Sequence, residues 1–327
     1  MTLRQRASRT LRAFDGFVAF RHLQHEGFGN AWRRWRLWTR VLDLPPVQTD
    51  AVSADASVEV HLVCCLKDYL CALWALKTFY VSAGVSYPLM IHLNGKMTTR
   101  ALSRLRTHLL NARILEQQHI EATVTNWLVT NNCPRLQQVR SKNGFMLKLV
   151  DVNLLSEAPR LLLLDSDVLF FRRPDELLSA VQGTHDGMLF QRDADSTYNL
   201  TLEEARTELG IDLAPRVNTG IMLFAKNAVD LCRCEALLAH PAVARQTGWI
   251  EQTLYALVAS ERERVRYLSA DYLVSLEPEE NLASLVARHY AGPSRRYLTE
   301  EGLPFALQTF GQRGVPRQVT AHVSNDT

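Results

Sequence analysis

Two carboxylates separated by one residue follow an apolar run in this chain. Asp165 and Asp167 come directly after four consecutive leucines, Leu161–Leu164, and precede the apolar segment Val168–Phe171. A carboxylate that emerges from a buried strand is costly to desolvate unless a cation or hydrogen-bond donors compensate its charge. Hard oxygen ligands of this kind suit Mg²⁺ or Mn²⁺, particularly beside phosphate oxygens. The tripeptide Asp165-Ser166-Asp167 therefore predicts a divalent-metal site at the end of a strand.

A second pair with the same spacing, Asp193 and Asp195, has a different setting. It lies within the polar stretch Gln191–Asn199, where carboxylates are readily solvated. Because aspartates this close together also occur by chance, the spacing alone does not indicate a metal site. We interpret the second pair as a solvated loop that could at most touch a substrate.

The chain around these aspartates alternates between strand and helix patterns. Apolar, β-branched runs predict strands over Val58–Leu66, Pro88–Leu93, Arg113–Glu116, Arg160–Leu164, Gly187–Gln191 and Gly220–Phe224. Helical spacing of apolar residues and helix-start signals predict helices over Tyr69–Val81, Thr98–Leu110, Phe145–Leu155 and Ile250–Ser260, with another beginning at Pro174 and a polar loop around Asn131–Arg135. Such alternation predicts an α/β fold with a mostly parallel central sheet flanked by helices. Ligands of these folds bind beyond the carboxyl ends of the strands.

The N-terminal region differs in composition from the rest. Residues 1–40 contain nine Arg and only two acids, a balance of +7. Trp32, Trp35 and Trp38 recur at helical spacing with arginines between them, which predicts a basic amphipathic helix. Such a helix either contacts an anionic membrane surface or packs on the body of the protein with solvated arginines. We favour packing, since one short Trp/Arg helix is a weak membrane signal. The segment from Pro45 to Ser57 is interpreted as a linker.

Charge and cysteine content exclude several classes of protein. The whole chain carries +3, so the part after residue 40 carries +3 − 7 = −4, and nucleic-acid binding is not expected. The six cysteines lack the spacing of a zinc site and are read as reduced thiols. No secretory signal or membrane span is recognised. We expect a cytoplasmic protein, peripheral to the membrane if its N-terminal helix binds there.

The segment Arg-Leu-Leu-Leu-Leu-Asp-Ser-Asp-Val-Leu-Phe-Phe at 160–171 resembles the strand and D-x-D motif of nucleotide-sugar-dependent glycosyltransferases with the GT-A fold. It is most similar to the retaining family-eight group, which includes glycogenin and lipopolysaccharide galactosyltransferases. The resemblance spans about residues 58–298. It implies a GT-A-like domain over 58–310, preceded by a basic helical appendage at 1–50 and followed by a tail at 311–327.

The activity implied by the resemblance is transfer of a sugar from a nucleoside diphosphate-sugar to an acceptor hydroxyl. The implied donor is a UDP-sugar, the cofactor Mn²⁺ or Mg²⁺, and the stereochemical outcome retention. The acceptor would be a glycan, a lipid-linked saccharide or a protein. Lys148, on the helix before the metal-site strand, matches a basic residue that reaches the donor phosphate or sugar, with Lys142 as a less certain neighbour. Ser166 is assigned to the donor site with it.

Three later segments follow in the order of that family. Val217–Phe224 is similar to its Asn-Ser-Gly strand, which implies that Asn218 hydrogen-bonds a sugar. Trp249-Ile250-Glu251-Gln252 is similar to its Asp-Gln pair, which implies that Glu251 or Gln252 lies near the anomeric carbon. The family usually has a further acid where this chain has Thr253, so the catalytic assignment within this helix stays open.

The third segment, His289–Arg296, resembles the family's His-x-x-Gly-x-x-Lys segment. The resemblance implies that His289 is the third metal ligand and that Gly292 allows a close backbone approach to the donor. Arg295 stands at the position of the diphosphate-binding Lys, and Arg296 is a second candidate for the same contact.

Other classes also place an Asp-x-Asp after an apolar strand. Haloacid dehalogenase-type phosphohydrolases do so, but their motif normally has Thr or Val where this chain has Leu169, and no strand-terminal acidic pair follows downstream. A non-catalytic nucleotide- or carbohydrate-binding protein is the second alternative. A nucleotidyltransferase is disfavoured because Leu66-Lys67-Asp68, after the first strand, lacks the glycines of a phosphate-binding loop.

Overall fold

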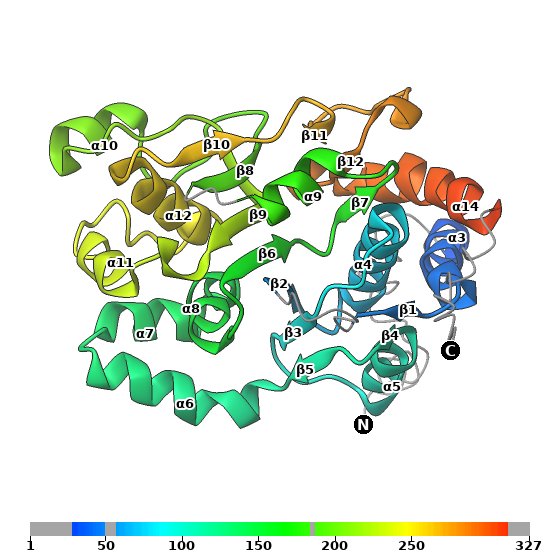
Figure 1. Cartoon of the computed structure of the whole chain (residues 1–327), viewed down its shortest axis with the longest axis horizontal. Coiled ribbons are helices and arrows are strands. Elements are labelled where there is room, and N and C mark those ends of the chain that lie inside the picture. The colour runs from blue at the N-terminus through cyan, green and yellow to red at the C-terminus, as the bar shows by residue number, and fades with distance from the viewer. Residues whose placement is uncertain (1–27, 50–56, 184–186, 313–327) are drawn as a thin grey trace, which may run out of the picture.

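A seven-stranded sheet lies at the centre of the computed structural model, which describes residues 28–49, 57–183 and 187–312 (Figure 1). The strand order is β10-β8-β9-β6-β2-β3-β5. The bounds are β2 Val58–Cys64, β3 Leu89–Leu93, β5 Arg113–Leu115, β6 Arg160–Leu164, β8 Met188–Arg192, β9 Val217–Ala225 and β10 Val265–Tyr267. Only β9 runs against its neighbours in this sheet, β6 and β8. The predicted α/β class with a mostly parallel sheet is confirmed.

Strand β6 is continuously apolar over Leu161–Leu164 because both of its faces are buried. Leu162 and Leu164 belong to one hydrophobic core, and Leu161 and Leu163 belong to a second core on the other face of the sheet. A strand covered on both faces has no solvent-facing side, so its sequence does not alternate between apolar and polar residues.

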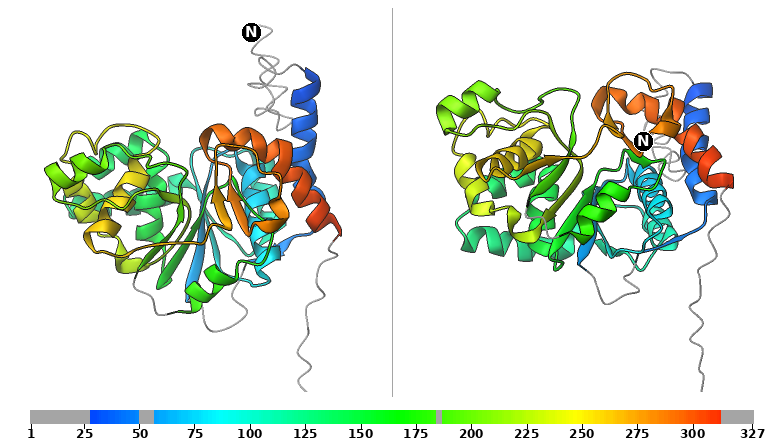
Figure 2. Two further views of the ribbon diagram at one scale, coloured as in Figure 1. Left: turned by 90° about the horizontal axis from the view of Figure 1, so that it is seen from above. Right: turned by 45° about the horizontal axis from the view of Figure 1, so that its top comes forward.

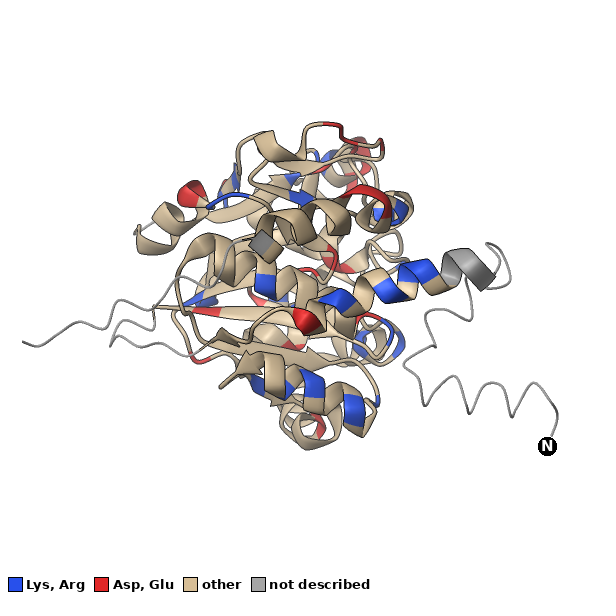
Figure 3. Ribbon diagram, turned by 90° about the vertical axis from the view of Figure 1, so that its right-hand side faces the viewer, with Lys and Arg blue, Asp and Glu red and all other residues tan. Residues whose placement is uncertain are grey.

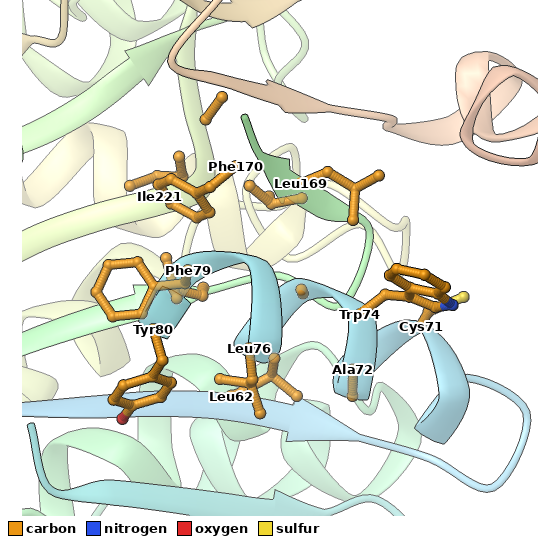
Figure 4. Close-up of a cluster of buried hydrophobic side chains, with 14 of the residues drawn as sticks. Leu62, Cys71, Ala72, Trp74, Leu76, Phe79, Tyr80, Leu169, Phe170 and Ile221 are labelled. Atoms are coloured by element: carbon orange, nitrogen blue, oxygen red, sulfur yellow. The ribbon is translucent and has the colours of Figure 1, made fainter. Parts of the chain in front are cut away.

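Helix α4, Tyr69–Ala83, is the centre of the first core. Figure 4 shows its side chains between Leu62 of β2 and the pair Leu169 and Phe170 of β7, Val168–Phe170. The rings of Phe79 and Phe170 meet edge to face, with their centroids 5.1 Å apart. This core therefore supports the segment that directly follows the two aspartates.

The remaining helices cover the two faces of the sheet. They are α5 Thr99–His108, α6 Gln117–Thr130, α7 Pro134–Lys142, α8 Met146–Leu155, α9 Asp175–Gln182, α10 Leu202–Leu209, α11 Leu231–Leu237, α12 Ile250–Glu261, α13 Arg295–Tyr297 and α14 Leu303–Gln312. Thr98 is the N-cap of α5, because its hydroxyl accepts a hydrogen bond from Ala101 N at 3.1 Å. Helices α6, α7, α10, α11, α13 and α14 were not predicted. Residues 131–133 of the predicted polar loop form the break between α6 and α7, but Pro134 and Arg135 already belong to α7.

A small sheet joins the C-terminal region to the aspartate segment. It consists of β11 Tyr272–Val274, β12 Ala287–His289 and β7, in the order β11-β12-β7. Strand β12 is antiparallel to β7, with His289 opposite Val168, and Tyr290 N donates to Asp167 O at 3.0 Å. This pairing brings His289 beside the aspartates.

Helix α3, Phe28–Thr39, lies along the outside of the domain next to α14 (Figure 2). Trp38 is buried in the first core, where its indole donates to Thr299 Oγ1 at 2.9 Å. The indole of Trp74 in α4 donates to Trp38 O at 3.0 Å. A short 3₁₀ turn, η1 Arg40–Asp43, follows. The helix therefore packs on the body, as in the interpretation favoured from the sequence.

The region predicted as a linker starts with ordered structure. Its residues form β1, Val47–Gln48, which pairs with β4, Leu109–Leu110, and Thr49 N donates to Leu110 O at 3.1 Å. Residues 50–56 of that linker, residues 1–27 of the predicted appendage and residues 313–327 of the predicted tail lie outside the described part of the chain.

Candidate metal and donor site

A cavity of about 1030 Å³ opens where β2, β3 and β6 end. The position agrees with the rule that ligands of α/β sheets bind beyond the carboxyl ends of the strands. Its lining includes Lys142, the less certain candidate, and ten of the eleven other residues predicted for the site: Lys148, Asp165, Ser166, Asp167, Asn218, Glu251, Gln252, His289, Gly292 and Arg295. Segments separated by almost 150 residues therefore converge on one space.

The predicted metal ligands come together on one wall of this cavity. One ligand atom each from Asp165, Asp167 and His289 lie within 4.8 Å of one another. His289 Nε2 is 3.2 Å from Asp167 Oδ1 and 3.7 Å from Asp165 Oδ2. Two carboxylates and one imidazole suit Mn²⁺ or Mg²⁺ and leave coordination positions for water or phosphate oxygens. The donor set thus fits a divalent cation.

The ring of His289 is oriented by Asn218. Its Nδ1 lies 2.8 Å from Asn218 Oδ1, so Nδ1 donates the hydrogen bond and Nε2 faces the carboxylates. The same amide oxygen accepts from Gly220 N at 2.9 Å, which fixes the amide on β9. Partners of this kind usually hold a metal-binding histidine in its ligating orientation. Asn218 therefore positions His289, a role that the sequence did not predict.

Charges around the cluster favour a cation between the carboxylates. Burial raises the pKa of Asp167, but its bond to His289 and the nearby Arg295 lower it overall to about 2. Burial lowers the pKa of His289, whereas Asp167 and Asp165 raise it more, so the net shift is upward. A divalent metal would take the place of the proton on His289 Nε2.

Gly220 leaves room for the His289 ring. A Cβ atom at residue 220 would lie 2.2 Å from His289 Nδ1 and 2.5 Å from Cε1, far inside van der Waals contact. Since Gly220 is in the middle of β9, neither partner can move away easily. The glycine of the Asn-Thr-Gly segment is therefore required for the position of the His289 ring.

Lys148 lies beneath the cluster and is almost fully buried. Its Nζ is 2.9 Å from Asp165 Oδ1 and 3.4 Å from Glu251 Oε1, and it donates to Thr219 O at 3.1 Å. The ammonium compensates two carboxylates that would otherwise be costly to bury. Lys148 thus holds Asp165 in place and links it to Glu251.

Glu251 and Gln252 begin α12 and face the same cavity. Burial raises the pKa of Glu251 to about 7, although the Lys148 charge opposes that shift. Glu251 Oε1 faces the Lys148 ammonium at 3.4 Å, and Glu251 Oε2 accepts from Thr219 Oγ1 at 3.2 Å. The Gln252 amide donates to Thr197 O at 3.0 Å. Thr253, which replaces the family's further acid, is buried and accepts from Asn199 N at 2.9 Å.

The interpretation of Asp193 as a solvated loop residue is corrected by the structure. Asp193 is half-buried and lines the cavity, where its Oδ2 accepts from Asn218 Nδ2 at 3.0 Å and from Gln252 Nε2 at 3.4 Å. Asp195 is exposed, as expected. The available signal was position, because Asp193 follows the carboxyl end of a predicted strand.

The two arginines of the last segment separate. Arg295 lines the cavity, with Nη2 2.6 Å from Asp68 Oδ1 and Nε 3.8 Å from Asp167 Oδ2. Asp68, which was not predicted, thereby holds this guanidinium toward the metal cluster. Arg296 is exposed, lies over the Tyr297 ring at 4.5 Å from its centroid and is absent from the described cavity lining. The structure does not bring this second phosphate candidate to the site.

Replacing Gly220 with Ala should displace the His289 ring and weaken Mn²⁺ binding by about 10- to 100-fold, the usual effect of disturbing the orientation of a ligand. Calorimetric titration with Mn²⁺ measures this. Gly311→Ala is the matched control, because a Cβ there meets nothing within 4 Å. His289→Gln removes the imidazole without overpacking and should weaken binding as well. Wild-type Mn²⁺ affinity in both Gly220→Ala and His289→Gln would show that His289 is not a ligand.

No protein-family model matches this chain, and no curated protein sequence matches it. Solved structures do. The bifunctional glycosyltransferase WbbM matches with a TM-score of 0.53 and 14% identity over 81% of this chain and 51% of WbbM. An active-site mutant of LgtC matches with a TM-score of 0.48 and 14% identity, over 79% of this chain and 98% of LgtC. Mouse xyloside xylosyltransferase 1 matches with a TM-score of 0.46 and 16% identity, over 75% and 98% of the two chains.

The chain spans about half the length of WbbM. At such low identity the likeness concerns the arrangement of the chain in space. Together with the central sheet and its flanking helices, it confirms the fold predicted from the sequence. The chain has a fold of the GT-A glycosyltransferase type.

Proposed function

We propose that the protein is a metal-dependent glycosyltransferase that moves a sugar from a nucleoside diphosphate-sugar, specifically a UDP-sugar, to an acceptor hydroxyl. The observation that carries this proposal is the convergence of Asp165, Asp167 and His289 in a cavity at the carboxyl ends of the strands. The GT-A-type fold supports it. The acceptor would be a glycan, a lipid-linked saccharide or a protein.

The residues of the metal cluster would act on the leaving group. Asp165, Asp167 and His289 would hold Mn²⁺ or Mg²⁺, which supplies positive charge to the diphosphate as its bond to the sugar breaks. Arg295, held by Asp68, would add a second positive charge on the same side. Lys148 would keep Asp165 oriented through its 2.9 Å contact. Ser166 and Gly292, which line the cavity, would contact the donor.

Asn218, Glu251 and Gln252 would contact the sugar of the donor. Glu251 is linked to the candidate metal cluster by Lys148, whose Nζ is 3.4 Å from its Oε1, and its Oε2 accepts from Thr219 Oγ1 at 3.2 Å. Its carboxylate would accept a hydrogen bond from a donor-sugar hydroxyl and stabilise positive charge at the anomeric carbon. Asp193 would add a second acceptor, oriented by the amides of Asn218 and Gln252. We infer retention from the family-eight resemblance, with the departing phosphate taking the proton of the acceptor hydroxyl.

The structure bears differently on the two alternative functions, phosphohydrolase and non-catalytic binding protein. A haloacid dehalogenase-type phosphohydrolase gains no support from a GT-A-type fold. A non-catalytic nucleotide- or carbohydrate-binding protein would use the same cavity, and only turnover separates it from an enzyme.

We further propose that α3 brings the protein to an anionic membrane surface. Its residues Trp32, Arg33 and Arg36 are exposed, whereas Trp38 is buried and anchors it to the body. Figure 3 shows several basic positions, in blue, along this helix. A Trp/Arg surface of this kind suits anionic lipid headgroups. No helix in the described ranges has the length and apolarity needed to span a bilayer. All six cysteines lie in the described part and are free thiols, which supports our proposal of a cytoplasmic location.

A panel of sugar nucleotides should yield at least one that stabilises the protein against heat and is hydrolysed or transferred only with Mn²⁺ or Mg²⁺. Asp167→Asn should lower that turnover by at least about 100-fold, because the charge stabilisation supplied by a metal is worth several kcal/mol. The measurement is nucleoside diphosphate release, with Asp195→Asn as the matched control on an exposed aspartate. The proposal fails if no sugar nucleotide gives stabilisation or turnover. Binding without turnover would identify the non-catalytic alternative.

Cosedimentation with vesicles tests the membrane proposal. The protein should bind vesicles that contain anionic lipid and not neutral ones. The double variant Arg33→Glu/Arg36→Glu should weaken binding by roughly fivefold for each arginine lost. Arg264→Glu/Arg266→Glu changes two exposed arginines near β10 and serves as the control. Equal binding of both double variants would contradict a role for α3.

A further inference from the structure

Three exposed apolar side chains line the cavity at its margin. Phe145, Trp249 and Leu276 are 55%, 50% and 45% exposed, and all three contribute to its lining. Most of the residues that line the cavity are polar or charged. Apolar side chains do not ligate a hard metal ion or hold a diphosphate, so these three have another role. Exposed apolar surface beside a polar ligand site usually marks a second contact area for a ligand.

The two aromatic residues are held by neighbouring loops that are tied together. Asn143 Nδ2 donates to Thr247 O at 2.8 Å and joins the segment before Phe145 to the segment before Trp249. Each backbone is also fixed locally, since Phe145 N donates to Asn143 Oδ1 at 3.0 Å and Trp249 N donates to Thr247 Oγ1 at 3.0 Å. The rings are therefore presented from restrained positions.

Glycines make the space between these loops. A Cβ on Gly144 would lie 1.9 Å from Asn94 Nδ2, so the Asn94 amide occupies the place of a side chain next to Phe145. A Cβ on Gly248 would lie 3.9 Å from Phe145 Cε2, which places the Phe145 ring beside the residue that precedes Trp249. The aromatic surface thus adjoins a neutral amide.

The polar groups next to the rings indicate what this surface would bind. Asn94 and Gln246 line the cavity with the aromatic residues and offer uncharged amide groups, whereas both amide atoms of Asn143 are already bonded. Lys142 also lines the cavity. A pyranose ring has an apolar face of C–H groups and an edge of hydroxyls, which suits an aromatic face flanked by amides. A lipid tail would bury those amides without hydrogen bonds, which is unfavourable.

We propose that Phe145 and Trp249, together with Leu276, form the acceptor subsite, and that the acceptor is a glycan whose terminal pyranose packs on an aromatic side chain. This inference rests on the proposed glycosyl transfer. It selects the glycan among the three acceptor classes expected from the resemblance.

The test compares transfer with the donor half of the reaction. The probes are methyl glucoside, methyl galactoside and lactose as acceptors, each with the sugar nucleotide that the wild-type protein turns over with Mn²⁺. Trp249→Ala and Phe145→Ala should each lower kcat/KM for the acceptor by about tenfold, the size expected for a lost aromatic contact, chiefly through KM. Trp249→Phe should restore most of the loss. Val129→Ala, which truncates a side chain that is 63% exposed and outside the cavity lining, is the control.

Hydrolysis of the sugar nucleotide without acceptor distinguishes failure of the proposed function from failure of the proposed acceptor subsite. If the wild type hydrolyses no donor, the proposed function fails and the inference fails with it. If the wild type hydrolyses a donor but glycosylates none of the three saccharides, only the acceptor subsite is overturned. The same holds if the kcat/KM for the acceptor in both alanine variants equals that of Val129→Ala. Transfer to a saccharide that is lost in the alanine variants while donor hydrolysis persists supports the subsite.

Discussion

The antiparallel pairing of β7 with β12 is the constraint on which the candidate site depends. It places His289 opposite Val168 and joins Tyr290 N to Asp167 O at 3.0 Å. Without it, the aspartates at the end of β6 would lack their third ligand, which comes from more than 120 residues later in the chain. The core around α4 supports β7 from below, and Gly220 leaves space for the imidazole ring. The chemistry of the site therefore depends on strand register as much as on the identity of its ligands.

Charge balance is the second element of the site. Carboxylates that are buried together are unstable without compensation. Lys148 compensates Asp165 and Glu251 from beneath, and Arg295 approaches Asp167 from the opposite side with Asp68 behind it. The four carboxylates of Asp68, Asp165, Asp167 and Glu251 outnumber the two cations, Lys148 and Arg295. A divalent metal would offset part of this negative charge and would let the site accept the diphosphate of a sugar nucleotide, which is why we propose transfer from such a donor.

The sequence predicted the parts of the site that have a local signature. Asp165 and Asp167 follow a short apolar run typical of a buried strand, and β2 and α4 have equally local patterns. The position of His289 was recovered from the order of motifs. Asp193 was misread because strand register is not visible in sequence, and β8 shifts its pairing between Phe190 and Gln191 just before that residue. Such irregularities redirect the side chains that follow them.

Other parts required the folded chain. Arg295 and Arg296 are adjacent, but neighbours on a helical turn point in different directions, so only Arg295 reaches the cavity. Helices α6 and α7 pack through a few buried residues each and have weak periodicity, so the sequence showed only the break between them. No sequence pattern connected Phe145 with Trp249. The loops that carry them are joined in the folded chain by the hydrogen bond from Asn143 Nδ2 to Thr247 O.

If the cluster of Asp165, Asp167 and His289 holds a metal that binds the diphosphate, metal and nucleotide must bind cooperatively. Calorimetric titration of UDP into the protein with and without Mn²⁺ measures this coupling. Mn²⁺ should raise the affinity for UDP by roughly 5- to 150-fold, and UDP should raise the affinity for Mn²⁺ by the same factor. The difference should disappear in Asp167→Asn. Equal UDP affinity in the presence and absence of Mn²⁺, with Mn²⁺ bound, would show that the two do not share this site.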